Sequence, residues 1–300
     1  MTSPRIVVVG SANVDLVATT KRAPRAGETV AGRSFTTGPG GKGANQAIAA
    51  ARAGGEVGFV GAVGDDVFAE QVRRALADAR VDISLLRTAP GPTGIAHIVV
   101  DGSGMNCIVV VAGANADLTE INPREAAAIA AADVVLLQLE IPLAGVIAAA
   151  RAAQGRVILD PAPAQELPGE LLEAIDLILP NEHEAATLTG IDDPHRALEA
   201  LLADVPAAAI TLGAGGVLFG ARSGARVAIR APSVAAVDTT AAGDALAGAL
   251  AVGLVDGLPV PEALRRAVAA ASLSVQRPGA SASMPDRDEI DRAAKTLPGA

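Results

Sequence analysis

Short apolar runs recur along the chain, and Ala-rich segments with a helical pattern separate them. The runs are RIVVVG at 5–10, EVGFVG at 56–61, DVVLLQLE at 133–140, RVILD at 156–160, IDLILP at 175–180 and AAAITLG at 207–213. They are continuous rather than alternating, as is typical of strands buried on both faces of a parallel sheet. The segments that predict helices are 43–53, 66–79, 123–131, 143–153, 182–189 and 195–203. This alternation predicts an α/β fold, a doubly wound sheet with helices on both faces.

Two segments interrupt this rhythm and indicate β-hairpins. One spans residues 14–37, and the other spans 93–111, where DGSG stands between two β-rich runs as a turn signal. We expect both to form a small antiparallel β lid inserted into the α/β core. Neither a tandem repeat nor a low-complexity linker is visible, so residues 1–300 are expected to form a single domain.

Composition excludes several classes of function. The chain has four Phe, no Trp and no Tyr, which disfavours stacking on nucleic-acid bases, and its net charge of −9 disfavours binding to a phosphate backbone. The lone Cys107 cannot form an internal disulfide, and no Cys/His cluster has zinc spacing. Neither a signal peptide nor a membrane-spanning stretch is visible. These features predict a cytoplasmic protein that binds neither nucleic acid nor membrane.

The stretch DTTAAGDAL at 238–246 predicts an anion site. Its small side chains let backbone N–H groups approach a ligand, and a helix that begins here would carry free donors and partial positive charge at its N-terminus. Asp244 lies in the predicted first turn. A base beside an anion hole is what phosphoryl transfer to a hydroxyl group needs. The alternative is that Asp244 only stabilises the helix end.

The glycine loop TGPGGKGANQA at 37–47 predicts a polyol site. Gly38, Gly40 and Gly43 formally satisfy GxGxxG, yet the loop does not follow the first strand directly, and the Walker A pattern also fails. A bare backbone, the rare Lys42 and Asn45 can bridge neighbouring hydroxyl groups. The alternative is a glycine turn into a helix that Asn45 caps.

Further polar side chains follow predicted strands. Asn13 and Asp15 in GSANVDLV lie on one side of an extended segment, unless an Asx turn explains them. Glu140 follows the run VVLLQ. In an open parallel sheet, ligands bind beyond the carboxyl ends of the strands, so we expect these side chains to line a site.

The segments LPNEHEA and TLGAGGVL indicate a second, nucleotide-binding part of the site. Asn181 and Glu184 stand three residues apart at a predicted helix start, where Glu184 could hold Mg²⁺ through water and Asn181 could instead be a helix cap. The glycines after Thr211 either support a nucleotide on their backbone or form a simple hairpin turn.

With these motifs together, the chain resembles the ribokinase group of the PfkB family of sugar kinases nearly from end to end. The matching segments are GSANVD, GGKGANQA, QLE, PNEHEA, TLGAGG, DTTAAGD and RPGASASMP. The resemblance implies a ribokinase-like fold and an ATP-dependent transfer of phosphate to the 5-hydroxyl of D-ribose. Asp244 would be the general base, and the backbone N–H groups of Ala241, Ala242 and Gly243 would form the anion hole.

The resemblance also assigns the remaining site residues. The sugar-binding positions match Asn13, Asp15, Gly41, Lys42, Gly43, Asn45, Glu140 and Asp244; the nucleotide-side positions match Asn181, Glu184, Thr211, Gly213 and Gly216, with Glu184 linked to Mg²⁺. A K⁺ ion beside the anion hole would take oxygen ligands from Asp238, Thr240, Ser274, Arg277 and Gly279, with Ser283 nearby. The family further implies a homodimer formed through the lid.

Departures from the family pattern leave alternatives open. Val268 stands where Asn is common near the adenine, and Gly215 stands where a larger residue is usual. The same mechanism could act on deoxyribose, a nucleoside, or another furanose or ketose. From other functional classes, the alternatives are an NAD-dependent oxidoreductase, from the formal GxGxxG match, and a non-catalytic sugar sensor.

Overall fold

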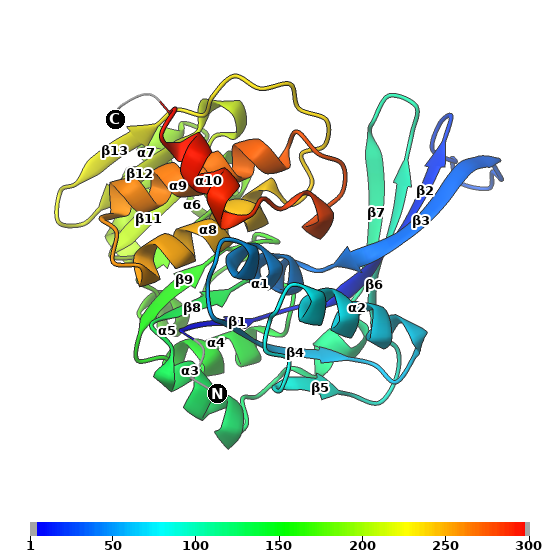
Figure 1. Cartoon of the computed structure of the whole chain (residues 1–300), viewed down its shortest axis with the longest axis horizontal. Helices are drawn as coiled ribbons and strands as arrows, with labels where there is room; N and C mark the ends of the chain where they lie inside the picture. Colours follow the sequence, from blue (N-terminus) through cyan, green and yellow to red (C-terminus); the bar gives the residue numbers. More distant parts are fainter. Residues whose placement is uncertain (1–4, 298–300) are drawn as a thin grey trace.

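The larger of two β-sheets forms the body of the molecule in a computed structural model, which describes residues 5–297 (Figure 1). Its strand order is β13-β12-β11-β10-β9-β8-β1-β4-β5. In this order, the seven strands β11, β10, β9, β8, β1, β4 and β5 run parallel to one another, and β12 and β13 add an antiparallel edge next to β11. Their bounds are β1 Ile6–Val9, β4 Val57–Val63, β5 Leu86–Thr88, β8 Val134–Leu137, β9 Arg156–Leu159, β10 Leu177–Ile178, β11 Ala207–Thr211, β12 Val217–Ala221 and β13 Arg226–Ile229.

Helices cover both faces of this sheet, which confirms the doubly wound fold. Successive strand residues alternate between two cores, so Ile6 and Val8 pack on one face and Val7 and Val9 on the other. The first face is covered by α1 Lys42–Arg52, α2 Val67–Asp78, α8 Ala242–Val255, α9 Val260–Ser274 and α10 Arg287–Ala294. The second is covered by α3 Pro123–Ala131, α4 Leu143–Ala152, α5 Gly169–Leu172, α6 Glu182–Thr189 and α7 Pro194–Asp204.

The smaller sheet projects from one side of the body (Figure 1). It consists of β2 Asn13–Thr20, β3 Gly32–Gly40, β6 Gly94–Val100 and β7 Asn106–Val111, in the order β3-β2-β6-β7. The pairs β2–β3 and β6–β7 are antiparallel, so the predicted hairpins are confirmed. The two hairpins join through the parallel pair β2–β6. The first residues of these two strands, Asn13 and Gly94, lie opposite each other.

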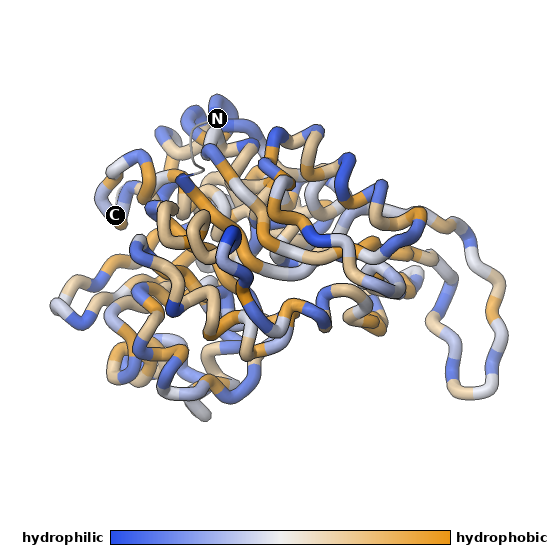
Figure 2. Tube along the Cα trace, turned by 90° about the horizontal axis from the view of Figure 1, so that it is seen from below, coloured by the Kyte–Doolittle hydropathy of each residue, from blue (hydrophilic) through white to orange (hydrophobic). Residues whose placement is uncertain are grey.

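The hydropathy of the trace follows this division (Figure 2). Apolar residues concentrate along the central strands and the helices that pack on them, whereas the tip of the smaller sheet is mixed in character. No helix between residues 5 and 297 is both long enough and apolar enough to cross a bilayer.

A glycine contact seats α1 against the end of β1. A Cβ added to Gly43 would lie 2.7 Å from the backbone of Gly10 and Ser11, closer than side-chain carbons pack. The Ala44 N–H donates to the Ser11 carbonyl at 2.9 Å across the same contact. The start of α1 is thereby held at the carboxyl edge of the large sheet.

Candidate active site

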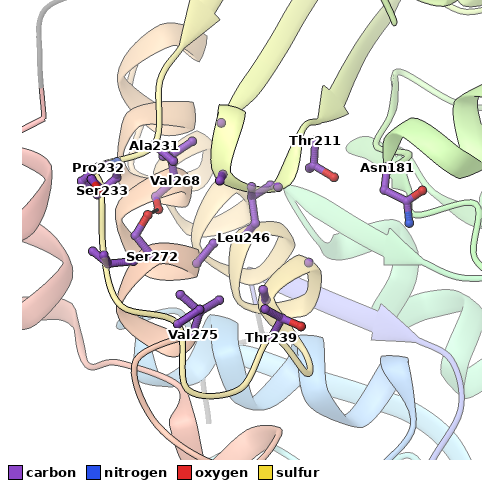
Figure 3. Close-up of a pocket in the computed structure, with 18 residues that line it drawn as sticks. Asn181, Thr211, Ala231, Pro232, Ser233, Thr239, Leu246, Val268, Ser272 and Val275 are labelled. Carbon is purple, nitrogen blue, oxygen red and sulfur yellow. Dashed lines mark hydrogen bonds between the residues drawn. The ribbon is translucent and has the colours of Figure 1, made fainter. Parts of the chain in front are cut away.

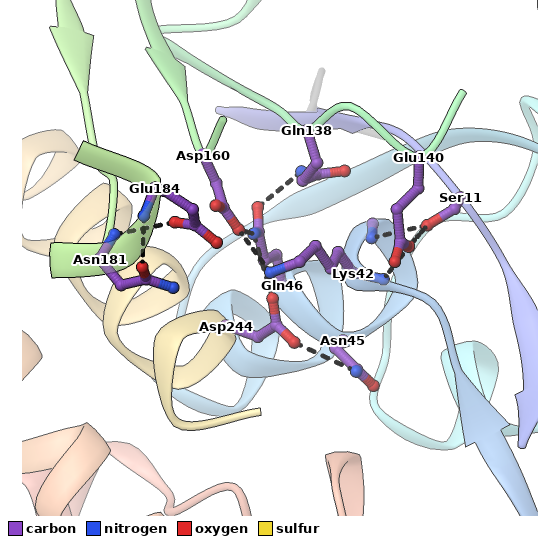
Figure 4. Close-up of polar contacts among 11 residues, drawn as sticks. Ser11, Lys42, Asn45, Gln46, Gln138, Glu140, Asp160, Asn181, Glu184 and Asp244 are labelled. Carbon is purple, nitrogen blue, oxygen red and sulfur yellow. Dashed lines mark hydrogen bonds and ion pairs between the residues drawn. The ribbon is translucent and has the colours of Figure 1, made fainter. Parts of the chain in front are cut away.

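Polar side chains from six parts of the chain converge at this carboxyl edge (Figure 4). They come from the turn after β1, the start of α1, the ends of β8 and β9, and the first turns of α6 and α8. Five carboxylates lie in electrostatic reach of one lysine, Lys42, or of each other; they are Asp15, Glu140, Asp160, Glu184 and Asp244. Burial, together with the negative charge of neighbouring acids, raises the pKa of Asp15, Asp160 and Asp244 above the usual value.

Asp244 is buried at the start of α8, only 4% exposed, and faces α1. Asn45 Nδ2 donates to its Oδ2 at 3.2 Å, and Gln46 Nε2 donates to its Oδ1 at 3.1 Å. Burial raises the pKa of Asp244 to about 6, although Lys42 and the two amides oppose the rise. The carboxylate makes no capping hydrogen bond to α8, so the simple helix-end interpretation does not describe its contacts.

The turn that precedes α8 leaves backbone donors available. Ala241, the N-cap, has φ of 60° in the left-handed region, which is uncommon for a residue with a side chain. Within residues 5–297, the N–H groups of Ala241 and Gly243 donate to no other protein atom, whereas that of Ala242 makes a long bond of 3.3 Å to the Thr239 carbonyl. Two of the three predicted anion-hole amides are thus available in this conformation.

Lys42 and Glu140 form the other side of the cluster. Lys42 Nζ lies 3.2 Å from Asp160 Oδ2, and its backbone N–H donates to Glu140 Oε2 at 2.9 Å. Ser11 Oγ donates to the same Glu140 oxygen at 2.5 Å. Burial favours the neutral form of Lys42, but Asp160 and the other carboxylates raise its pKa above the usual value. Gly41 has φ of 87°, which only glycine adopts readily, and turns the chain from β3 into α1.

Asn45 is buried on the inner face of α1 and does not cap the helix. The N-cap of α1 is Gly41, with no side-chain capping bond, and the Asn45 amide instead reaches Asp244. Its Oδ1 has no hydrogen-bond partner among the described residues. A buried carbonyl oxygen of this kind is suited to accept from a ligand hydroxyl group.

Asn13 and Asp15 project from the same side of β2, as the spacing predicted. Asn13 Oδ1 accepts a hydrogen bond from Asn115 Nδ2 at 2.7 Å. Asn115 lies in the 3₁₀ segment Gly113–Asp117. A Cβ on Gly40 of β3 would lie 2.0 Å from Asp15 Oδ1, so the carboxylate occupies the space that Gly40 leaves. Burial, followed by the charges of Glu140 and Asp244, raises the pKa of Asp15 to about 6.

Asp238 ties the turn before α8 to the loop after α9. Its Oδ1 accepts from the Thr240 N–H and its Oδ2 from the Gly279 N–H, each at 2.9 Å. Burial works against ionisation, but these hydrogen bonds hold the pKa of Asp238 below its usual value. Ser274 and Ser283 are fully buried, and Arg277 forms an ion pair with Glu289 of α10. The predicted cation ligands therefore lie on the turn before α8 and on the end of α9 with the segment that follows it, and Asp238 connects the two.

A cavity of about 520 Å³ adjoins the N-terminus of α8 (Figure 3). Gly243 and Thr239 line it at the α8 end, and Thr211, Gly213 and Gly216 line it from the turn between β11 and β12. Apolar side chains make up the far end, namely Val234, Leu246, Val268, Ala271 and Val275. A volume of this size suits a nucleotide-sized ligand.

Asn181 also lines this cavity, but its side chain is a helix cap. Its Oδ1 accepts from the Glu184 N–H, and Glu184 Oε2 accepts from the Asn181 N–H, both at 2.8 Å. This capping box starts α6. Asn181 was interpreted either as a nucleotide-binding residue or as a helix cap. Its hydrogen bonds are those of a helix cap.

The glycine pattern does not form a dinucleotide-binding turn. Gly38 and Gly40 belong to β3 of the smaller sheet, and Gly43 lies inside α1. A dinucleotide fingerprint instead joins the first strand of a βαβ unit to its helix. The formal GxGxxG match therefore gives no support to an NAD-dependent oxidoreductase.

Several polar residues of the cluster were not anticipated as site residues. Asp160 follows β9 as Glu140 follows β8, so the strand-end argument applies to it equally. Burial raises the pKa of Asp160 to about 7, against the effect of Lys42. Gln138 likewise follows a strand, and Gln46 is next to Asn45 in the glycine loop. Asn115 has no comparable sequence signal.

Comparisons with known proteins agree with this geometry. The model of the pfkB family carbohydrate kinases matches residues 3–287. The chain belongs to the pfkB family of carbohydrate kinases. Within that family, it is 41% identical to a ribokinase of Haemophilus influenzae, over 95% of this chain and 96% of the relative. It is 43% identical to a ribokinase of Bacillus subtilis, over 95% and 98% of the two chains.

A solved structure of the family has nearly the same fold. The structure of Arabidopsis thaliana ribokinase complexed with ribose and ATP superposes with a TM-score of 0.93 at 35% identity, and covers 98% of this chain and 99% of that one. The pfkB-family resemblance inferred from the motifs is thus confirmed, as is the ribokinase-like fold.

Proposed function

We propose that the chain transfers the γ-phosphoryl group of ATP to the 5-hydroxyl of D-ribose, giving D-ribose 5-phosphate and ADP. The observation that carries the proposal is the position of Asp244. It stands buried between the sugar-binding loop of α1 and the turn whose Gly243 lines the nucleotide-sized cavity. The ribokinases of 41% and 43% identity, and the complex with ribose and ATP, support ribose and ATP as the two substrates.

Asp244 acts as the general base of the transfer. The sugar hydroxyl oxygen forms a bond to the γ-phosphorus while its proton passes to the Asp244 carboxylate. The bond between the γ-phosphorus and the bridging oxygen breaks, and ADP leaves with those electrons. With a pKa of about 6, the carboxylate is largely ionised at neutral pH and still basic enough to accept the proton.

The start of α8 stabilises the negative charge on the phosphoryl group during its transfer. The free N–H groups of Ala241 and Gly243, together with the partial positive charge of the helix end, favour the negative oxygens there. Lys42, held ionised among carboxylates, adds a full positive charge on the sugar side. The donors are fixed before the reaction, so little reorganisation is needed.

The sugar is bound by the polar groups that face Asp244. Asp15 and the free carbonyl oxygen of Asn45 accept from hydroxyl groups, and Asn13 supplies an amide beside them. Glu140 accepts hydrogen bonds from the Ser11 hydroxyl and from the Lys42 N–H, and these bonds order the glycine loop. Glu140 also faces the ligand. Gly41 and Gly43 let the loop backbone come close to the sugar.

The expected ions fit the residues present. Mg²⁺ prefers oxygen ligands and retains water, and Glu184 has one carboxylate oxygen outside its capping bond. K⁺ would be held by the ionised Asp238 and by carbonyl oxygens of Thr240, Ser274, Arg277 and Gly279, with Ser283 beside them. When bound, the two ions supply positive charge beside the phosphates and beside the α8 turn.

We further propose that two copies associate through the smaller sheet. Edge strand β7 exposes apolar side chains on both of its faces, with Ile108 51%, Val109 63% and Val110 56% exposed. Exposed apolar edges of this kind are typical of interaction surfaces. Analytical ultracentrifugation should show a dimer, and Val109→Lys with Ile108→Glu should give a monomer. A monomeric parent chain at micromolar concentration would contradict this assignment.

A sugar panel tests the proposed reaction and its alternatives together. ADP release is measured with D-ribose, 2-deoxyribose, nucleosides, and other furanoses and ketoses, each in K⁺ and in Na⁺ or choline. We expect D-ribose to give the highest kcat/KM, with faster turnover in K⁺. If another acceptor gives a higher kcat/KM than D-ribose, that acceptor becomes the proposed substrate and the proposed mechanism stays the same. No turnover with any acceptor would favour a non-catalytic sugar sensor.

A further inference from the structure

Two buried glutamine side chains connect residues of the polar cluster to one another. Gln46 of α1 and Gln138, which follows β8, are both 0% exposed. Gln46 Nε2 donates to Asp244 Oδ1 at 3.1 Å and to Asp160 Oδ2 at 2.8 Å. Gln46 Oε1 accepts from Gln138 Nε2 at 2.6 Å. One amide group therefore contacts two carboxylates with its donor end and a second amide with its acceptor end (Figure 4).

We propose that Gln46 is a positioning residue for Asp244, and that Gln138 fixes which end of the Gln46 amide faces that carboxylate. This inference rests on the proposed kinase function and goes beyond it, because neither glutamine is needed to contact the sugar or the nucleotide. The proposal concerns the orientation of the base, not the transfer itself.

The chemistry of the two ends of the amide makes the orientation consequential. In the observed orientation, the N–H groups of Gln46 point to carboxylate oxygens, as hydrogen bonding requires. If the amide were turned over, its carbonyl oxygen would face the carboxylates of Asp160 and Asp244. Its NH₂ group would then face the NH₂ group of Gln138. Both contacts would be repulsive, so the two carboxylates and the Gln138 donor together favour the observed orientation.

The far end of the Gln138 side chain occupies the space that Gly10 leaves, and its bond to Gln46 Oε1 sets which end of the amide is the donor. A Cβ added to Gly10 would lie 1.9 Å from Gln138 Oε1, so the carbonyl end of the side chain lies against the bare backbone of Gly10. That oxygen has no hydrogen-bond partner among the described residues. The bond from Nε2 to Gln46 is thus the one polar contact of the Gln138 side chain within residues 5–297.

The consequence for Asp244 is that it stays ionised and aimed at the sugar. Donors that contact a carboxylate favour its charged form, and the Gln46 and Asn45 amides do so for both oxygens. The charged groups that face Asp244 are Lys42, Asp15, Glu140 and Asp160. Because three of these four are acids, loss of the Gln46 donor would leave Asp244 easier to protonate.

The test uses Gln46→Met and Gln138→Met, which keep the length of the side chain and remove its hydrogen-bonding groups. ATP and D-ribose turnover is measured as kcat and KM from pH 5 to pH 9. Because a hydrogen bond to a charged group is lost, we expect kcat of Gln46→Met to fall about 10- to 100-fold. Gln138→Met should fall less, about 3- to 10-fold, because its effect passes through Gln46. Ribose KM should change little, and the acid limb of the kcat profile should move to higher pH.

Circular dichroism and thermal melting establish that each variant folds. If Gln138→Met is too unstable to assay, Gln138→Asn replaces it, because its amide is one methylene too short to reach Gln46. An unchanged acid limb with an unchanged kcat per folded molecule would overturn the proposal. So would a uniform loss at every pH, which is the mark of a merely structural role. An inactive parent chain would instead count against the proposed function.

Discussion

Gly248 of α8 lies directly against Ala49 of α1. A Cβ on Gly248 would stand 2.6 Å from the Cβ of Ala49, and equally close to the Ala50 nitrogen. The two helices can therefore approach closely only because this position lacks a side chain. The same two helices carry Asn45 and Asp244, whose hydrogen bond joins residues 199 positions apart in sequence.

Gly248→Ala should separate the helices and disturb the site. We expect a loss of about 1–3 kcal/mol in the free energy of unfolding, as for other overpacked cores, and a lower kcat. Urea denaturation and steady-state assays measure the two effects. Gly169→Ala is the matched control, since a Cβ there meets nothing within 4 Å. Equal stability of both variants would contradict the packing argument.

Asp244→Asn should remove the general base while the fold remains. The amide cannot take the hydroxyl proton, so kcat should fall by about 10²–10⁴-fold. Glu262→Gln makes the same change in the first turn of α9 and should leave kcat unaltered. Full turnover by Asp244→Asn, with an unchanged circular dichroism spectrum, would rule out this role.

Asp15→Asn should stabilise the ligand-free protein at pH 8 and weaken ribose binding. The folded-state pKa of about 6 lies above the unfolded value of 3.8, so this group favours folding most below pH 4. That contribution is lost as pH rises through 6. We expect Asn to add roughly 1–3 kcal/mol at pH 8, and almost nothing at pH 4. Thermal melts at both values, with ribose KM, test this; a pH-independent difference would contradict it.

The apolar end of the nucleotide-sized cavity should discriminate poorly between purine bases. Val268, Ala271 and Val275 offer no side-chain hydrogen bond to a base edge, and edge-specific hydrogen bonds are what give strong discrimination. We expect kcat/KM for GTP within about 10-fold of that for ATP, and a larger difference in Val268→Asn. Strong ATP preference in the parent chain would show that backbone groups, or the hydroxyl groups of Ser233 and Ser272 in the cavity wall, read the base.

Asp238→Asn should abolish the response of turnover to K⁺. The neutral amide no longer compensates a cation, and the hydrogen bond from Thr240 to the carboxylate is weakened. kcat is compared in K⁺, Na⁺ and choline for both proteins. Asp256→Asn, a partly exposed acid beyond the end of α8, is the control. A K⁺ response that survives in Asp238→Asn would remove the carboxylate from the cation site.

The fold was predictable because its strands are buried on both faces. Such strands must be continuously apolar. Each of the six predicted runs does contain a strand of the large sheet, with small errors at the ends. The pattern did not lead us to assign α9 or α10, although Asp286 and Glu289 form a capping box at the start of α10. The parallel pairing of β2 with β6 depends on contacts that are distant in sequence, and local patterns carry no information on it.

The candidate site was predictable where a motif brings its residues together in sequence. Asn13, Lys42, Asn45 and Asp244 fall into two glycine-rich motifs and one strand-end motif. Asp160 was not predicted, because it closes the apolar run RVILD and so was counted as part of the strand. The hydrogen bonds of the two buried glutamines arise from tertiary packing, which the sequence does not display.

Asp15 belongs to β2, and β2 is also a central strand of the projecting sheet. This continuous strand runs from Asn13, beside the polar cluster, to Thr20 in the projecting part of the smaller sheet. Under the proposed function, tilting of β2 would change the contacts of Asp15 with the sugar and the position of β7, the proposed dimer edge. Ribose binding and dimer formation are therefore expected to influence each other through this strand.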